Sequence, residues 1–181
     1  EARKFCGFSD DKPVVLIIGG SLGAAAVNDA VRKILPQLLP KYNVIHLCGK
    51  GKLDESLKGT AGYVQYEYIK KELADLFALA DVVISRAGAN AICELLALKK
   101  PNILIPLPAA ASRGDQILNA NSFKKQGFSE VIDEEKITDD LLLETINNVY
   151  NNRSKYVEAM EKSPQQNGVE AVISLIKEVT K

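Results

Sequence analysis

The chain is organised around one turn of small residues, Ser85-Arg-Ala-Gly-Ala-Asn-Ala-Ile-Cys-Glu94. The apolar run before it, Asp81 to Ile84, is typical of a strand, and Ala91 to Leu98 has the spacing of a helix. Such a turn directs the unpaired N–H groups at the helix start toward the space above the sheet, where the helix dipole favours an anion. Glu94 lies about one turn into the helix, where a carboxylate can accept hydrogen bonds from paired sugar hydroxyls. The stretch therefore suits a nucleotide sugar, although a tight connection with a surface glutamate explains the same residues.

The composition suits a soluble globular domain and excludes several function classes. Among 181 residues, 46% are hydrophobic and 25% charged, which is enough for one core. Lys plus Arg equal Asp plus Glu at 23 each, so charge favours neither nucleic acid nor an anionic membrane. The three cysteines show no paired spacing, so we expect a reducing cytoplasm. Because His46 is the single histidine and the sequence has no CxxC, we expect neither a metal nor a cofactor. The chain begins without Met at a charged stretch, and we expect a piece of a longer protein.

Strand-like and helix-like segments alternate along the chain. We expect strands at Pro13–Ile18, Asn43–Cys48, Gly62–Tyr68, Val82–Ser85, Asn102–Ile105 and Phe128–Ile132. We expect helices at Ala24–Leu38, Glu72–Ala80, Ala91–Leu98, Asp115–Gln126, Asp139–Tyr150, Lys155–Glu161 and Val169–Val179, with a kink or an early end at Pro36. This alternation predicts an α/β fold, a Rossmann-like doubly wound parallel sheet of about six strands with helices on both faces, in a single domain over residues 1–181.

Four loops fall at the carboxyl edge of this sheet, where such folds bind ligands: Gly19–Ala24, Tyr68–Glu72, Ser85–Asn90 and Pro106–Gln116. The first reads Gly-Gly-Ser-Leu-Gly-Ala, so it is compact enough to cradle a phosphate and adds the Ser21 hydroxyl. It matches neither the dinucleotide fingerprint nor a P-loop. The glycines also fit close packing of helix on strand, but a second such loop in the same sheet favours a ligand.

The fourth loop brings Asp115, Gln116 and Asn119 to a helix start, where their side chains can bind several hydroxyls. Asp115 also fits a first-turn helix acid and Asn119 a structural role, whereas helix formation gives less reason for Gln116. His46, on an apolar strand, is typical of a satisfied core residue. No pair of carboxylates and no Ser/His/Asp set indicates acid–base or nucleophilic catalysis. The chain is better equipped to bind than to catalyse.

Three motifs together carry a family resemblance: Gly19–Ala24, Ser85–Ala89 with Glu94, and Ser112-Arg-Gly-Asp-Gln116-Ile-Leu-Asn119-Ala120. In this order they resemble the C-terminal half of the MurG family, the family 28 glycosyltransferases that transfer N-acetylglucosamine (GlcNAc) to lipid I to form lipid II in bacterial peptidoglycan synthesis. The resemblance covers nearly the whole chain. It implies one half of a GT-B fold, in which two Rossmann-like domains face a cleft and the C-terminal one holds the UDP-sugar donor.

The resemblance also implies roles for individual residues. Ser21 and the glycines around it would contact the donor diphosphate, and backbone groups of Ile69 would contact uracil. Residues 86–90 would form the second phosphate loop, Glu94 would hold the ribose, and Gln116 with Asp115 would hold the GlcNAc hydroxyls. Ala91 and Asp115 depart from residues that are frequent in the family, which puts one hydroxyl contact and one sugar contact in doubt. The expected substrate-binding set is Gly20, Ser21, Leu22, Gly23, Ile69, Arg86, Gly88, Ala89, Asn90, Glu94, Asp115, Gln116 and Asn119.

The family's N-terminal domain would supply the acceptor site for lipid I, the catalytic base and the membrane-docking surface. We therefore expect this chain to be an inactive donor domain without catalytic residues, soluble and cytoplasmic, and the full-length enzyme to be peripheral on the cytoplasmic side of the bacterial membrane. Neither nucleic acid nor a metal is expected. Two alternatives stay open: an isomerase domain like that of UDP-GlcNAc 2-epimerase, and a non-catalytic one-domain subunit that binds a separate membrane partner.

Overall fold

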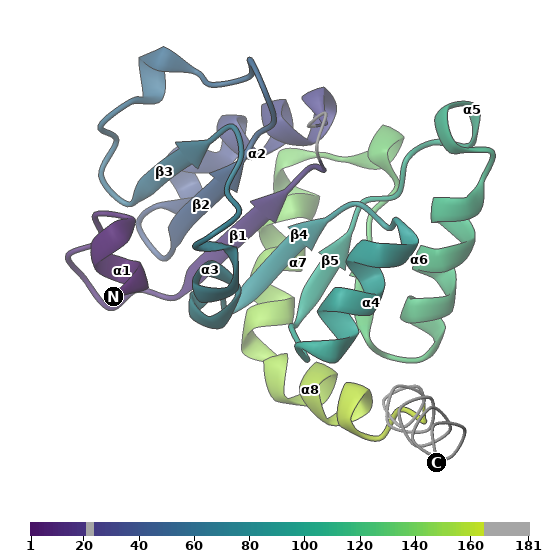
Figure 1. The fold of residues 1–181 in the computed structure, drawn as a ribbon. Helices are drawn as coiled ribbons and strands as arrows, with labels where there is room; N and C mark the ends of the chain where they lie inside the picture. Colours follow the sequence, from purple (N-terminus) through teal and green to yellow (C-terminus); the bar gives the residue numbers. More distant parts are fainter. Residues whose placement is uncertain (21–23, 165–181) are drawn as a thin grey trace, which may run out of the picture.

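Six parallel strands form the sheet at the centre of the molecule. The structure is a computed structural model and describes residues 1–20 and 24–164. The strand order is β3-β2-β1-β4-β5-β6, and every neighbouring pair is parallel. In Figure 1 the arrowheads, which mark the carboxyl ends of the strands, all lie at the same edge of the sheet. The strands are β1 (Val14–Ile18), β2 (Asn43–Leu47), β3 (Tyr63–Tyr66), β4 (Val82–Ser85), β5 (Asn102–Leu104) and β6 (Ser129–Val131). The predicted Rossmann-like α/β fold is confirmed.

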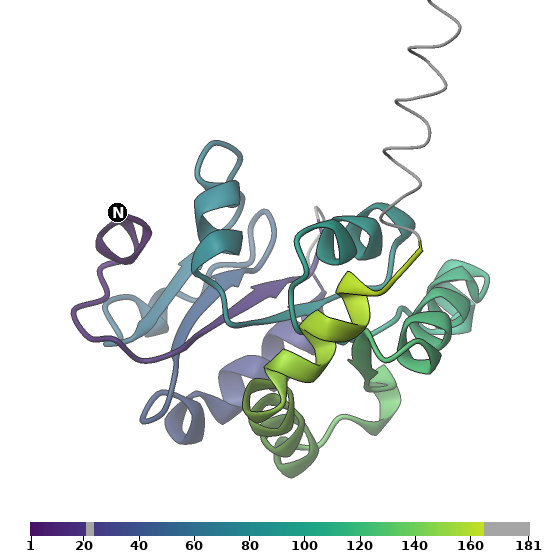
Figure 2. The same cartoon turned by 90° about the horizontal axis from the view of Figure 1, so that it is seen from below.

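Helices cover both faces of this sheet, as Figure 2 shows. One face carries α2 (Ala25–Leu38) and α7 (Asp139–Asn151), which contact each other. The other face carries α3 (Leu73–Leu79) and α4 (Ala89–Ala97), with α6 (Asp115–Lys125) beside α4. The remaining elements are α1 (Ala2–Phe5), the 3-10 turns η1 (Glu55–Leu57) and η2 (Glu134–Lys136), α5 (Ala109–Ser112) and α8 (Arg153–Glu161).

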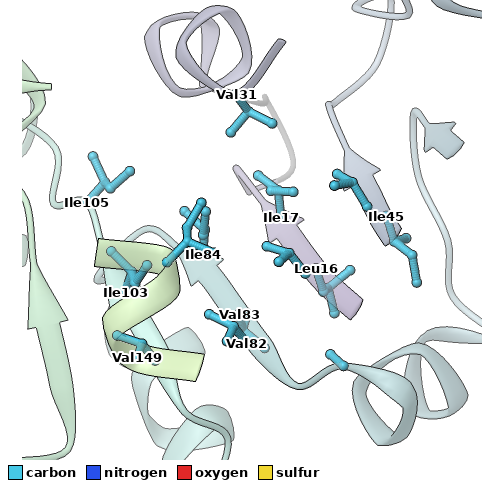
Figure 3. Close-up of a cluster of buried hydrophobic side chains, with 14 of the residues drawn as sticks. Leu16, Ile17, Val31, Ile45, Val82, Val83, Ile84, Ile103, Ile105 and Val149 are labelled. Carbon is cyan, nitrogen blue, oxygen red and sulfur yellow. The ribbon is translucent and has the colours of Figure 1, made fainter. Parts of the chain in front are cut away.

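The core lies on both sides of the central strands. Residues 14–17 of β1 are completely buried, because a strand covered by helices on two faces needs apolar side chains at successive positions. Figure 3 shows Val31 of α2 lying against the sheet near Ile17, and Val149 of α7 beside Ile103 of β5. The continuous apolar runs that indicated strands in the sequence are thus explained by burial.

The helix boundaries differ from the prediction in two places. Of the two alternatives predicted at Pro36, a kink or an early end of α2, the early end is wrong, since the helix continues to Leu38. Pro36 lies in the last turn, where its missing N–H removes a single hydrogen bond. Helix α4 begins at Ala89, two residues before the predicted start, because Gly88 already acts as its N-cap.

Other segments also depart from the prediction. The segment predicted as a loop before α6 contains the short helix α5, whose N-cap is Pro108. Strand β3 is shorter than predicted, and the N-terminal helix α1 was not predicted. The predicted helix Val169–Val179 lies outside the described residues.

A buried polar cluster fixes α2 to the sheet close to the start of the helix. His46 of β2 is completely buried, with Nδ1 2.9 Å from the Tyr63 hydroxyl and Nε2 2.8 Å from Asn28 Oδ1. Asn28 also donates its amide N–H to the Cys48 carbonyl, at 2.8 Å. Asn28 Oδ1 must therefore accept from His46 Nε2–H, and Nδ1 accepts from Tyr63. His46 is a satisfied core residue, as the sequence indicated.

This cluster predicts a pH-dependent stability. Burial, with a smaller contribution from the Arg32 charge, lowers the pKa of His46 from 6.5 to about 3. Below pH 6.5 the unfolded chain binds a proton that the folded chain does not, so the free energy of unfolding falls as the pH falls toward 3. Between pH 7 and pH 5, His46 should cost about 2 kcal/mol of stability.

The measurement is urea unfolding of the wild type and of His46→Gln at both pH values. The carboxylates are common to both chains, so the difference between their pH dependences isolates the imidazole. The wild type should lose about 2 kcal/mol more than the variant on acidification, although the variant is less stable at pH 7. Equal losses in both chains would contradict the assigned pKa.

Candidate functional site

The ends of β1 and β4 lie side by side at the carboxyl edge of the sheet. These two strands are neighbours, yet the chain leaves β1 toward β2 and leaves β4 toward β5, so the strand order reverses between them. Ligands of open α/β sheets bind in the crevice at such a switch point. Figure 1 shows the start of α4 and the end of β1 at this edge.

The start of α4 presents unpaired backbone N–H groups to this edge. Gly88 is its N-cap, with φ −65°, and no side chain caps the helix. Ala89 and Asn90 are exposed. A Cβ built on Gly88 would meet only the Gln116 amide nitrogen among the described atoms, at 3.8 Å, so neither backbone conformation nor packing requires glycine. A glycine at this point leaves room for a ligand to approach the backbone.

Glu94 follows on the same helix and is exposed. Across the described ranges its carboxylate makes no ion pair and no hydrogen bond, so both oxygens are free to accept from a ligand. The predicted anion seat and the predicted carboxylate are therefore carried by one helix.

Gln116 and Asn119 of α6 hold the turn before α4. Gln116 Oε1 accepts from the backbone N–H of Ala87 at 3.2 Å and of Leu107 at 3.0 Å. Asn119 Nδ2 donates to the Ala87 carbonyl at 3.0 Å. The Gln116 amide nitrogen has no hydrogen-bond partner in the part of the chain that the structure describes, and it lies beside Gly88. Gln116 thus joins two loops through its oxygen, and its amide N–H groups stay unpaired among the described residues.

The side chain of Arg86 makes its contacts within the protein. Its guanidinium donates to the carbonyls of Ile105, at 3.1 Å, and Pro106, at 3.4 Å, and forms an ion pair with Glu134 of η2. Sequence reasoning missed Glu134, which follows β6 and is separated from Arg86 by 48 positions. No local motif links the two residues; only the neighbourhood of β4, β5 and β6 in the sheet brings them together.

The remaining predicted residues lie around the same edge. Ile69 is in the loop before α3 with its side chain buried, and its backbone N–H and C=O bond to no described residue. Asp115 is exposed at the first position of α6. Gly20 has φ +89°, a conformation that favours glycine. Ser21, Leu22 and Gly23 lie outside the described residues.

A pocket of about 520 Å³ opens between the β5–α5 loop, α6 and η2, with Pro106, Ile117 and Glu134 among its walls. Glu134, which forms the ion pair with Arg86, thus also lines this pocket. No group of three or more His, Cys, Asp or Glu side chains within residues 1–20 and 24–164 could hold a metal ion. The arrangement can bind an anion through backbone N–H groups and hydroxyls through Glu94 and Gln116.

Known proteins match this chain closely. A protein of Lachnospira eligens named UDP-N-acetylglucosamine–N-acetylmuramyl-(pentapeptide) pyrophosphoryl-undecaprenol N-acetylglucosamine transferase is 60% identical over 176 residues, which are 97% of this chain and 50% of that protein. A protein of the same name from Lachnoclostridium phytofermentans is 63% identical over 175 residues, 97% of this chain and 49% of that protein. The chain spans about half the length of the curated relatives it matches.

The crystal structure of Acinetobacter baumannii MurG superposes with a TM-score of 0.75 at 27% identity, covering 97% of this chain and 52% of that one. The family model described as the glycosyltransferase family 28 C-terminal domain matches residues 14–176. The matched range includes the first glycine loop, the turn before α4, Glu94 and Gln116. The chain therefore belongs to the glycosyltransferase family 28 C-terminal domain family.

Proposed function

We propose that residues 1–181 form one donor-binding domain, the UDP-GlcNAc half of an enzyme that transfers GlcNAc to lipid I in peptidoglycan synthesis. The observation that carries the proposal is the start of α4, where unpaired N–H groups, an unobstructed Gly88 and the free carboxylate of Glu94 lie on one helix. A nucleotide sugar offers the matching groups: a diphosphate for the N–H groups and paired hydroxyls for the carboxylate. The names of the relatives support uracil and GlcNAc as the base and the sugar.

In the proposed complex each loop of the edge binds one part of the donor. The loop with Gly20, Ser21, Leu22 and Gly23 and the turn with Gly88, Ala89 and Asn90 bind the diphosphate. Ile69 offers its backbone N–H and C=O to uracil, and Glu94 accepts from the ribose hydroxyls. Gln116 donates its free amide N–H groups to GlcNAc, with Asp115 and Asn119 nearby.

The helix starts also supply the chemistry that this half contributes to transfer. As the bond between GlcNAc and the diphosphate breaks, negative charge grows on the leaving UDP. Oriented N–H groups that already point at this position stabilise the charge without reorganisation. The nucleophile and its base would come from the acceptor half, which also brings lipid I and the membrane contact at the cytoplasmic face. Among the helices of the described residues, none is long and apolar enough to cross a membrane.

An isomerase acting on the same donor would need a histidine and catalytic acids at the ligand. The single histidine of the sequence, His46, is buried in the sheet with both ring nitrogens occupied. The chain itself therefore supplies no histidine for that chemistry, and binding for transfer is the better supported function.

The ribose contact is tested by calorimetric titration of this chain with UDP and with NAD. We expect UDP to bind, and Glu94→Ala to weaken it about 10- to 100-fold, because hydrogen bonds to a charged acceptor contribute about 1.5–3 kcal/mol. Glu144→Ala is the matched control, since it removes an exposed helical glutamate from α7. Binding of NAD in place of UDP, or equal affinities in the two variants, would contradict the assigned site.

The sugar contact is tested with Gln116→Glu. A carboxylate at this position still accepts from the Ala87 and Leu107 N–H groups but cannot donate to GlcNAc. We expect unfolding free energy close to that of the wild type and an affinity for UDP-GlcNAc that falls about tenfold more than that for UDP. Repulsion by the new charge acts more strongly on UDP, which carries more negative charge, so a preferential loss of UDP-GlcNAc reports the lost sugar contact.

Two further variants control for folding. Gln116→Ala leaves both backbone N–H groups without an acceptor and should lower the unfolding free energy by about 2–3 kcal/mol. Gln126→Ala, at the exposed C-cap of the same helix, removes only the exposed bonds of its amide to Ser122, so it should lower the unfolding free energy by less than about 1 kcal/mol and leave the affinity unchanged. A loss of affinity for UDP as large as for UDP-GlcNAc in Gln116→Glu would remove Gln116 from the sugar site.

A further inference from the structure

The ion pair between Arg86 and Glu134 is the most buried one described. The side chains are 11% and 21% exposed, whereas each of the other ion pairs includes a side chain that is at least 38% exposed. The Arg86 guanidinium also donates to the carbonyls of Ile105 and Pro106. One side chain therefore connects the segments that follow β4, β5 and β6.

Glu134 is the single carboxylate within ion-pair distance of Arg86 in the described ranges. The Arg86 Nε atom is buried and has no hydrogen-bond partner there, so the carboxylate compensates a guanidinium that has little access to water. Removing one partner of a largely buried pair leaves an uncompensated charge, which is costly. Without Glu134, Arg86 would have to leave its position or shift the backbone that carries it.

The backbone that would shift is the turn before α4. Ala87 follows Arg86 directly and is held from the other side by Gln116 and Asn119. The turn is thus fixed between α6 on one side and η2 on the other. The directions of the N–H groups at Gly88 and Ala89 depend on both attachments, and a backbone anion site binds well only when its donors are already oriented.

We propose that Glu134 is a positioning residue for the donor diphosphate, which it serves by holding Arg86 and hence the turn before α4. The proposal rests on the proposed function of this edge as a UDP-sugar site. It assigns Arg86 a role in holding the phosphate loop, where direct contact with the phosphates is the alternative. Glu134 itself contacts the loop through Arg86 alone among the interactions described for the two residues.

The test compares Glu134→Gln with Glu135→Gln in this chain. Both remove one negative charge at adjacent positions, but Glu135 is exposed and makes no ion pair with Arg86. The ligands are UDP, titrated by calorimetry, and uridine, titrated by NMR because it lacks phosphates. We expect Glu134→Gln to weaken UDP about tenfold while uridine changes much less, since charged hydrogen-bond networks contribute on this scale. Glu135→Gln should behave as the wild type.

A double variant separates positioning from direct contact. Arg86→Gln combined with Glu134→Gln replaces the ion pair by two neutral amides of similar size and removes the uncompensated charge. If Arg86 holds the loop, the double variant should bind UDP better than Glu134→Gln alone. If Arg86 contacts the phosphates, the double variant should bind UDP no better than the single one, and the proposal is overturned.

The outcomes are distinguishable from failure of the proposed function. Wild-type chain that does not bind UDP would contradict the donor site itself. Wild-type binding with equal affinities for UDP in Glu134→Gln and Glu135→Gln would contradict only the positioning role. Urea unfolding of each variant monitors the fold, and a lower unfolding free energy with an unchanged ratio of UDP to uridine affinity would reduce Glu134 to a structural residue.

Discussion

The site depends on one topological constraint, the reversal of strand order between β1 and β4. Connections between parallel strands are right-handed, so the chain that leaves β1 places α2 on one face and the chain that leaves β4 places α4 on the other. Two helix starts then face the same edge from opposite sides of the sheet. Because both sets of N–H groups lack partners within their helices, the edge carries partial positive charge that no side chain has to provide. An anion seat follows from the connectivity.

Hydrogen bonds from side chains to the backbone then hold the loops of this edge in fixed positions. Loops at strand ends have backbone groups that the sheet does not pair, and here Gln116, Asn119 and Arg86 pair several of them. At the other helix, His46 and Asn28 fix α2 close to its start through a buried chain of hydrogen bonds. Polar groups inside the protein are thus concentrated where loop positions must be fixed, while the sheet between them is held by apolar packing.

Much of this architecture was visible in the sequence, because burial on two faces produces apolar runs such as Val14 to Ile18 and because small residues mark the turn before α4. Glu94 was also predicted, because it lies close to the turn in the sequence.

Glu134 was not predicted, because it meets Arg86 only through the arrangement of three strands. In the sequence, a glutamate followed by Glu135 and Lys136 looks like part of a solvated surface. Helix α5 was missed because a four-residue helix after Pro108 has no periodicity to detect. Gln116 was predicted as a ligand residue from its place at a helix start and from the family resemblance, and the structure adds that it accepts from two backbone N–H groups.

The proposed donor site uses two kinds of recognition, one by backbone N–H groups and one by side chains. In this proposal, backbone N–H groups bind the diphosphate. Many side chains can therefore change without loss of this contact, provided that the residues near Gly88 stay small and the turn keeps its position. Side chains bind the hydroxyls, so each hydroxyl contact depends on a particular residue such as Glu94 or Gln116. The departures from the family pattern at Ala91 and Asp115 fall among side-chain contacts and leave the backbone seat intact. Differences between this protein and its relatives in the use of the proposed donor should therefore concern the sugar and the ribose more than the diphosphate.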